Sequence, residues 1–293
     1  MRVAISGTHG LIGGALAGLL RAGGATVLSV GRSAESEIRW DPMRGRLDAR
    51  ALDGVDAVVH LSGAPIGRRW TRAHWEEIVE SRVRSTLLMA ETLASMERAP
   101  AVLVNASAVG FYGSRGDELL TESSVAGEGF LADLVQAWED ATKPASARGV
   151  RVVNLRTGVV LSSKGGALRQ MLPAFRLGVG GPVGDGRQWM SWISLHDLVR
   201  AIRHLLTSEL RGPVNVASPV PVTNEEFART LGSVLSRPAF VRVPAFALRA
   251  VFGRMADETL LASQRVVSER LLASGFRFDA PSLAGALSDE LGV

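Results

Sequence analysis

Short apolar runs alternate along most of this chain with longer segments whose apolar residues recur at helical spacing. Residues 2–6 form a run rich in β-branched residues that ends at a glycine, which predicts a buried strand. Residues 14–20 have helical apolar spacing, and residues 25–30 form a second apolar run. These segments predict a strand–helix–strand unit at the N-terminus.

The alternation continues beyond this unit. Thr71 is a predicted N-cap for a long helix that extends to about Arg98, and a second helix is predicted from about Phe130 to Arg148. Further strands are expected within residues 53–63, 101–107, 150–156, 187–193 and 213–217. Strands that alternate with helices predict an α/β fold with a doubly wound parallel sheet.

Three glycines separate the first strand from the first helix. Gly7, Gly10 and Gly13 leave room for a tight turn, for close approach of a phosphate to the backbone, and for tight packing of helix on strand. The N-terminus of the following helix presents N–H groups and its positive dipole end to an anion. The pattern predicts a dinucleotide site, and the alternative is an ordinary structural turn.

The end of the second strand indicates which dinucleotide binds. An NAD-binding unit usually has Asp or Glu there to hold the ribose 2′-hydroxyl, whereas this chain has Gly31, Arg32 and Ser33. A guanidinium is permanently charged and can donate two hydrogen bonds to a 2′-phosphate. We therefore predict NADP(H) as the cofactor. The alternative for Arg32 is an exposed loop arginine without a ligand.

Composition and charge argue against a membrane-spanning or nucleic-acid-binding protein. The chain is 46% hydrophobic and 21% charged, has no cysteine, and contains no apolar run of the roughly 20 residues that span a bilayer. The formal charge is +4, but the arginines are scattered and only Lys143 and Lys164 are lysines. We expect a cytoplasmic protein that binds neither nucleic acid nor membranes. A homodimer is left open.

Several motifs resemble the extended short-chain dehydrogenase/reductases. The glycine pattern, the segment 60–63 and Ser107 before Tyr112 occur in the order that this group uses. The chain more closely resembles an atypical branch, the epimerase-family proteins with a C-terminal domain of unknown function. Segments that carry this closer resemblance include Leu61–Ile66, Arg69–Trp70, Glu80–Arg82, Trp138–Glu139, Arg156–Leu161, Trp192–Leu198 and Gly275–Phe278.

The resemblance implies the fold, the domains and the cofactor residues. We expect a Rossmann-type NADP(H)-binding domain over residues 1–217, with 162–192 contributing to the substrate cleft, and a small, mostly helical C-terminal domain over 218–293. The residues implied to bind the cofactor are Gly7, Gly10, Leu11, Ile12 and Gly13 at the pyrophosphate, Arg32 and Ser33 at the 2′-phosphate, Leu61 and Ser62 at the adenosine ribose, and Glu77, Arg82, Ser107 and Arg156 elsewhere along the cofactor.

The catalytic dyad of the family is missing. The family uses a tyrosine with a lysine four residues later, and the lysine lowers the tyrosine pKa. Tyr112 is the only tyrosine, and Gly116 stands four residues beyond it. Ser107 and Tyr112 remain as catalytic candidates. The alternatives are a small residue at a strand end for Ser107 and a buried aromatic with a hydrogen-bonded tip for Tyr112.

Two functions are compatible with these residues. One is an NADP(H)-dependent oxidoreductase or epimerase-like enzyme that acts on an unidentified small carbonyl or hydroxyl compound. The other is a non-catalytic NADP(H)-binding regulator or redox sensor that acts through protein partners. Several other polar and aromatic residues are considered for the site, and a structural role is favoured for each of them. These residues are Asp117, Glu118, Glu122, Trp189, Trp192, His196 and Asp197. No metal site is predicted.

Overall fold

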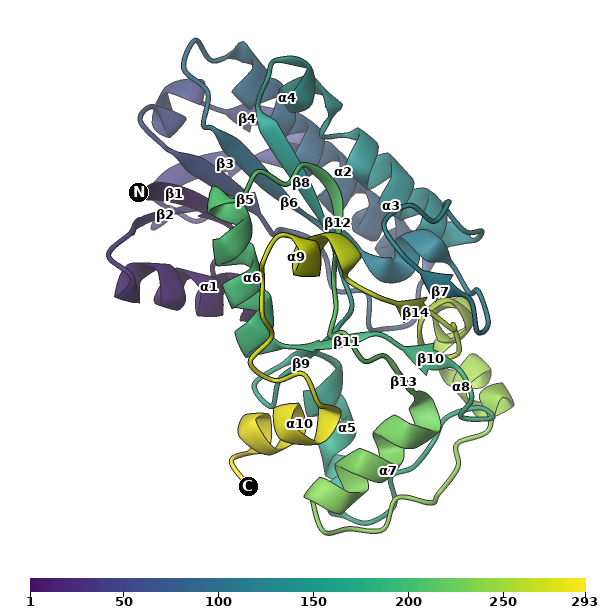
Figure 1. Cartoon of the computed structure of the whole chain (residues 1–293). Helices are drawn as coiled ribbons and strands as arrows, with labels where there is room; N and C mark the ends of the chain where they lie inside the picture. The colour runs from purple at the N-terminus through teal and green to yellow at the C-terminus, as the bar shows by residue number, and fades with distance from the viewer.

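Eight strands form one sheet in the order β12-β8-β6-β5-β1-β2-β3-β4 in the computed structural model, which describes residues 1–293 (Figure 1). Neighbouring strands are parallel except for β3 and β4, which are antiparallel. The strands are β1 (Arg2–Ser6), β2 (Thr26–Gly31), β3 (Ile38–Asp41), β4 (Arg46–Leu47), β5 (Ala57–His60), β6 (Val102–Ala108), β8 (Arg151–Thr157) and β12 (Gly212–Val216). The predicted parallel sheet is confirmed.

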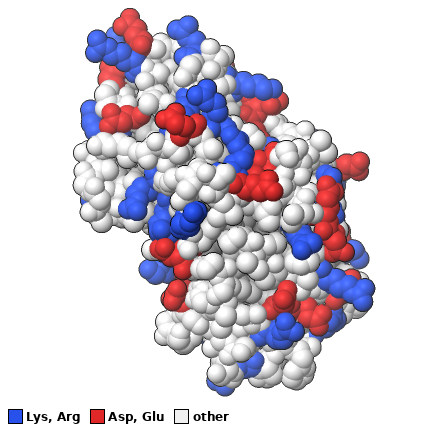
Figure 2. All heavy atoms as spheres, in the orientation of Figure 1, with Lys and Arg blue, Asp and Glu red and all other residues white.

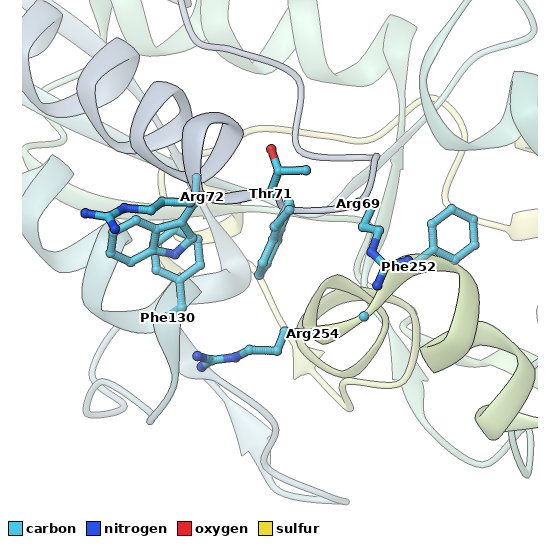
Figure 3. A pocket seen from close by; sticks show the side chains of 9 residues that line it. Arg69, Thr71, Arg72, Phe130, Phe252 and Arg254 are labelled. Atoms are coloured by element: carbon cyan, nitrogen blue, oxygen red, sulfur yellow. The ribbon is translucent and has the colours of Figure 1, made fainter.

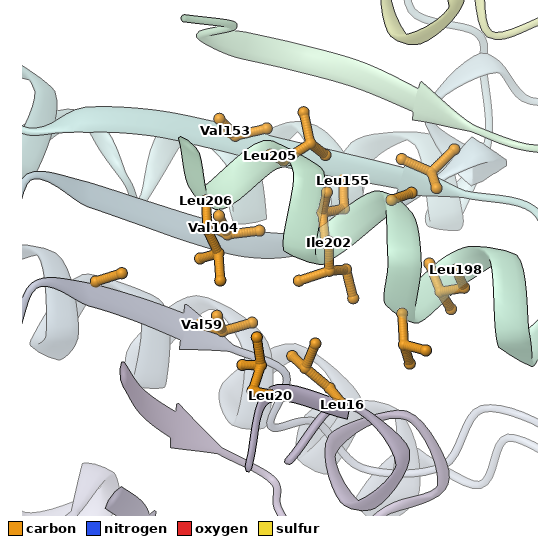
Figure 4. Close-up of a cluster of buried hydrophobic side chains, with 14 of the residues drawn as sticks. Leu16, Leu20, Val59, Val104, Val153, Leu155, Leu198, Ile202, Leu205 and Leu206 are labelled. Carbon is orange, nitrogen blue, oxygen red and sulfur yellow. The ribbon is translucent and has the colours of Figure 1, made fainter. Parts of the chain in front are cut away.

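Helices cover both faces of this sheet (Figure 1). Because successive strand residues point to opposite faces, Val3 and Ile5 enter one core while Ala4 enters the other. α1 (Leu11–Ala22) and α6 (Leu195–Thr207) close the first core, part of which Figure 4 shows. The second core is closed by α2 (Arg72–Ser95), with α4 (Lys143–Ala147) packed beside it, and α3 (Phe130–Asp140) also packs on α2.

Two predicted elements are divided in the structure. The helix expected from about Phe130 to Arg148 is interrupted between α3 and α4, so the prediction of one continuous helix was wrong. The proline at position 144 has no N–H to donate and lies in the first turn of α4, where that loss is tolerated. The run 187–193 forms two short strands outside the main sheet, β10 (Trp189–Met190) and β11 (Trp192–Ser194).

Three helices that lie below the sheet in Figure 1 share a separate hydrophobic cluster, which joins distant parts of the chain. It combines α5 (Gly166–Arg176) and Trp192 with α7 (Asn224–Val234) and α10 (Leu283–Leu291). The segment before α10 also returns to the nucleotide-binding half, because α9 (Glu269–Ala273) packs on β12. The predicted boundary after residue 217 remains a prediction.

The remaining elements are short. None of the helices of the chain combines the length and hydropathy that crossing a bilayer requires. On the face in Figure 2, basic and acidic side chains lie near one another. The short elements are η1 (Pro42–Arg44), η2 (Ala49–Leu52), η3 (Val109–Tyr112), β7 (Leu119–Leu120), β9 (Val159–Leu161), β13 (Val222–Thr223), α8 (Ala245–Phe252), η4 (Ala256–Leu260) and β14 (Arg265–Val266).

A histidine at the end of β5 lies fully buried beneath the glycine loop. His60 Nδ1 is 2.6 Å from the Ser6 hydroxyl, and Nε2 is 3.0 Å from the Ser85 hydroxyl of α2. The rings of Trp40 and His60 pack edge to face at a centroid distance of 5.4 Å. Burial lowers the pKa of His60 to about 4, so the ring is neutral at pH 7.

This buried imidazole should make stability depend on pH. Its pKa is lower in the folded state than the usual 6.5. Between pH 6.5 and about pH 4 the unfolded chain therefore binds more protons at this group than the folded chain does. In that interval the protein should lose up to about 3 kcal/mol of unfolding free energy through this group. Urea unfolding measures the unfolding free energy of the unmodified protein and of His60→Gln. The stability advantage of the unmodified protein over this variant should shrink as the pH falls. A constant difference across the interval would contradict the assignment.

Candidate functional site

The glycine loop between β1 and α1 is shaped to hold an anion. Gly7 has φ of +79°, a conformation that favours glycine. A Cβ atom at Gly13 would lie 2.2 Å from the carbonyl oxygen of Gly7, so only glycine lets α1 approach the loop this closely. Gly10 caps α1 without a side-chain hydrogen bond, and the N–H groups of Leu11, Ile12 and Gly13 donate to no protein acceptor. These free donors at a helix N-terminus fit a phosphate.

The loop after β5 lies against this turn. A Cβ atom at Gly7 would be 3.1 Å from the carbonyl oxygen of Leu61, and the Leu61 N–H donates to the Ser6 hydroxyl at 3.1 Å. Leu61 and Ser62 are both partly exposed. The structure therefore brings the predicted ribose-lining residues to the carboxyl edge of the sheet beside the predicted pyrophosphate loop, where open α/β sheets bind ligands.

Arg32 and Ser33 follow β2 at the same edge and are exposed. No protein group forms a hydrogen bond or ion pair with the Arg32 guanidinium, so it is free to meet a phosphate. The loop that carries Arg32 is held at its far end by Glu37, whose carboxylate accepts hydrogen bonds from the hydroxyl and the N–H of Ser29. These bonds from Ser29 lower the pKa of Glu37.

Two predicted cofactor residues on α2 are engaged with protein groups. Arg82 donates to the carbonyl oxygens of Ala64 at 2.9 Å and Ile78 at 3.2 Å, and burial lowers its pKa to about 10. It therefore supports the loop after Leu61 and Ser62. The Glu77 carboxylate is 2.9 Å from Nδ1 of His74. Contact of Glu77 and Arg82 with a cofactor remains a prediction.

Ser107 lies near the end of β6 and is held by an acidic residue that sequence reasoning did not assign to the site. Its hydroxyl donates to Oε1 of Glu139 at 2.6 Å. Arg156 donates to both oxygens of the same carboxylate, each at 2.8 Å, and only 4% of its side chain is exposed. The sequence did offer one indication of Glu139, because Trp138–Glu139 is among the segments that carry the family resemblance. The bridge occupies two of the three guanidinium nitrogens. Contact of Arg156 with the cofactor also remains a prediction.

Tyr112 has a structural position. Its side chain is fully buried, and its hydroxyl donates to Oδ1 of Asn215 at 2.7 Å and accepts from Arg156 at 3.1 Å. Burial raises its pKa, although the hydrogen bond from Arg156 opposes this effect. Tyr112 is thus a buried aromatic residue with a hydrogen-bonded tip, and its predicted catalytic role remains a prediction. Ser107 and Tyr112 are connected through Glu139 and Arg156 and do not bond to each other.

Contacts within the protein also engage several of the other residues weighed in the sequence. Trp192 is fully buried, and the indole N–H of Trp189 donates to Asp117 at 2.7 Å. The three groups His196, Asp197 and Asp279 lie close enough to suggest a metal site. However, both carboxylate oxygens of Asp197 already accept backbone N–H groups, from Asp279 and residue 280. This carboxylate fixes the chain before α10.

Comparisons with known proteins match the whole chain. The model of the NAD dependent epimerase/dehydratase family matches residues 3–217, and that of a domain of unknown function, DUF1731, matches residues 243–290. Epimerase family protein MT2273 of Mycobacterium tuberculosis is 46% identical over 290 residues, which cover 97% of this chain and 96% of the relative. These matches confirm the resemblance found in the sequence.

Solved structures agree with this result. A crystal structure of human epimerase family protein SDR39U1 (isoform 2) with NADPH has a TM-score of 0.92 and 36% identity, and the match covers 100% of both chains. A nucleoside-diphosphate sugar epimerase from Corynebacterium glutamicum has a TM-score of 0.80 and 37% identity, and the match covers 100% of this chain and 58% of that one.

The contact between α1 and the glycine loop can be tested with a matched pair of substitutions. Gly13→Ala should destabilise the protein by about 1–3 kcal/mol, because the new methyl group meets the backbone of Gly7. Gly18→Ala, in the same helix, has open space and should be neutral or stabilising by up to about 1 kcal/mol. Chemical denaturation measures both values, and equal stability of the two variants would show that the packing is looser than described.

Proposed function

The chain belongs to the NAD dependent epimerase/dehydratase family, and from this membership and the site we propose that it is an NADP(H)-dependent oxidoreductase or epimerase-like enzyme. Its substrate would be a small carbonyl or hydroxyl compound. The observation that carries the proposal is the anion-binding loop with three free N–H groups, which lies at the same sheet edge as the unpaired Arg32. The NADPH in the crystal structure of the human relative supports this choice of cofactor.

The residues present fit this cofactor. Leu11, Ile12 and Gly13 would donate their N–H groups to the pyrophosphate, and Arg32 would pair with the 2′-phosphate. Leu61 would line the adenosine-ribose side. When bound, NADP(H) supplies or accepts the hydride, so the protein has to hold the substrate and handle a proton.

Ser107 is the group that we assign to the substrate oxygen. It lies near the carboxyl end of β6, at the sheet edge shared with the glycine loop. Its hydrogen bond to Glu139 fixes the hydroxyl, and the bidentate bridge to Arg156 fixes Glu139 in turn. In this arrangement the hydroxyl can accept a hydrogen bond from an alcohol O–H, and it can donate to a carbonyl oxygen when its proton turns from Glu139 to the substrate. Holding the substrate oxygen in one position is a large part of what an enzyme of this kind must do.

The second candidate function is a cofactor-binding regulator or redox sensor. One observation favours it: the only tyrosine is fully buried, and no lysine stands four residues after it. In this case the nucleotide site would be kept while proton transfer would be lost. Screening quinones, aldehydes and α-dicarbonyls with NADPH separates the two functions. No turnover of any carbonyl, together with tight NADPH binding, would favour the regulator.

The choice of cofactor depends on Arg32. NADPH should bind more tightly than NADH, and Arg32→Ala should reduce this preference by about 1–3 kcal/mol, the scale of a hydrogen bond to a charged group. Arg229→Ala removes an exposed arginine from α7 and should leave the preference unchanged. Titration followed by intrinsic tryptophan fluorescence measures both. Equal affinity of the unmodified protein for the two nucleotides would overturn the assignment.

Ser107 and Tyr112 should respond differently to substitution. If a reducible carbonyl is found, Ser107→Ala should lower kcat/KM by about 10²–10⁴-fold, the range for positioned acid–base groups. Tyr112→Phe should keep most activity but lower the unfolding free energy by about 1–3 kcal/mol, because it leaves buried polar atoms of Asn215 and Arg156 unpaired. Steady-state kinetics and denaturation distinguish these effects. Full activity of Ser107→Ala would exclude Ser107 from catalysis.

A further inference from the structure

A cavity of about 400 Å³ lies where the nucleotide-binding half meets the C-terminal portion. Its walls come from the loop before α2, the first turn of α2, the start of α3 and the end of α8 (Figure 3). The lining residues are Arg69, Trp70, Thr71, Arg72, Trp75, Phe130, Phe252, Gly253 and Arg254. None of these residues belongs to the predicted cofactor set. The cavity is therefore a second candidate binding site.

Aromatic rings form one side of this cavity. The ring of Phe130 lies 5.1 Å from that of Trp70, edge to face, and 4.8 Å from that of Trp75 at an interplanar angle of 33°. Trp70 is fixed, because its indole N–H donates to the carbonyl oxygen of Ile66 at 3.0 Å. Trp75 is 43% exposed, so a large part of a flat apolar ring faces solvent. Such a surface suits a second flat ring system.

The charged residues that line the cavity all carry positive charge. Arg69, Arg72 and Arg254 are exposed, and no acidic residue lines the cavity. Arg69 makes only one long contact, 3.5 Å from Nη1 to the carbonyl oxygen of residue 250. In Figure 3, Arg69 extends from the loop before α2 toward Phe252. Most of its five N–H donors therefore remain available to an anion.

The arginine from the C-terminal portion is held near the start of α3. Glu258 accepts a hydrogen bond from the N–H of Leu131 at 2.7 Å, which ties η4 to the first turn of α3. The same carboxylate is 3.2 Å from the Arg254 guanidinium, which passes below Phe130 in Figure 3. This pair uses one nitrogen of Arg254 and leaves its other donors unpaired.

We propose that this cavity binds a flat, conjugated organic anion, such as a carboxylate on a fused ring system. The exposed ring of Trp75, supported by the buried ring of Phe130, would pack against the ligand, and Arg69 and Arg254 would pair with its carboxylate. A cavity of this volume falls within the usual range for small-molecule sites, about 300–1,000 Å³. The inference goes beyond the proposed function, because it assigns a ligand to residues outside the predicted cofactor site.

The test compares two probes of the same shape, 2-naphthoate and its neutral amide, 2-naphthamide. Isothermal titration calorimetry on the full chain saturated with NADPH, and on the chain without it, measures their affinity. We expect 2-naphthoate to bind at least about ten-fold more tightly than 2-naphthamide, the scale of one charged hydrogen bond. Equal affinity of the two probes, or no saturable binding of 2-naphthoate at millimolar concentration, would overturn the proposal.

Variants then locate the binding site. The double variant Arg69→Ala/Arg254→Ala and the single variant Trp75→Ala should each weaken 2-naphthoate binding by about ten-fold or more. Both change exposed side chains, and thermal melting checks that they fold. Arg229→Ala is the control and should have no effect. Unchanged binding in the double variant would place the probe elsewhere, and NADPH titration of the same variants keeps this result separate from cofactor binding.

Discussion

The nucleotide-binding half depends on one close approach, that of α1 to the backbone of the glycine loop. Gly13 sits where any side chain would collide with Gly7, so the helix can begin directly above the end of β1. This placement aims the free N–H groups of the first turn along the carboxyl edge of the sheet. The loop at Leu61 also packs against Gly7, where a Cβ atom would lie 3.1 Å from the Leu61 carbonyl oxygen. The predicted phosphate and ribose contacts therefore both depend on close packing around Gly7.

A buried ion pair organises the residues around the carboxyl ends of β6 and β8. The bridge between Arg156 and Glu139 joins β8 to α3, and through hydrogen bonds it also fixes Ser107 and Tyr112. Arg156 lies 3.4 Å from the ring centre of Phe111, so its guanidinium is enclosed on that side as well. A charge buried this deeply needs both partners, because breaking the pair would leave one of them uncompensated. Tyr112 contributes to this buried network, because its hydroxyl accepts a hydrogen bond from Arg156 and donates one to Asn215.

Local signals made most of the fold predictable. Apolar runs identified the main parallel strands, and the spacing of Gly7, Gly10 and Gly13 identified the turn, because each signal lies within a few neighbouring residues. The division of the helix after residue 140 was missed, although the proline at 144 marked it. The cavity near Trp75 and the bond between Ser107 and Glu139 could not be predicted, since their parts lie far apart in the sequence and meet only through the tertiary fold.

The helix α2 connects the two proposed sites. It is a single helix of 24 residues, and it carries Trp75 at the cavity as well as Glu77 and Arg82, which are predicted to reach the cofactor. Trp75 and Glu77 are separated by only about 3 Å of rise along the helix axis. A ligand in the cavity and a bound cofactor would therefore contact the same rigid element. This arrangement serves an enzyme, which must hold a substrate beside its cofactor, and it equally serves a sensor, in which one ligand alters the affinity for the other. The chemistry at Ser107, rather than the presence of two sites, separates these functions.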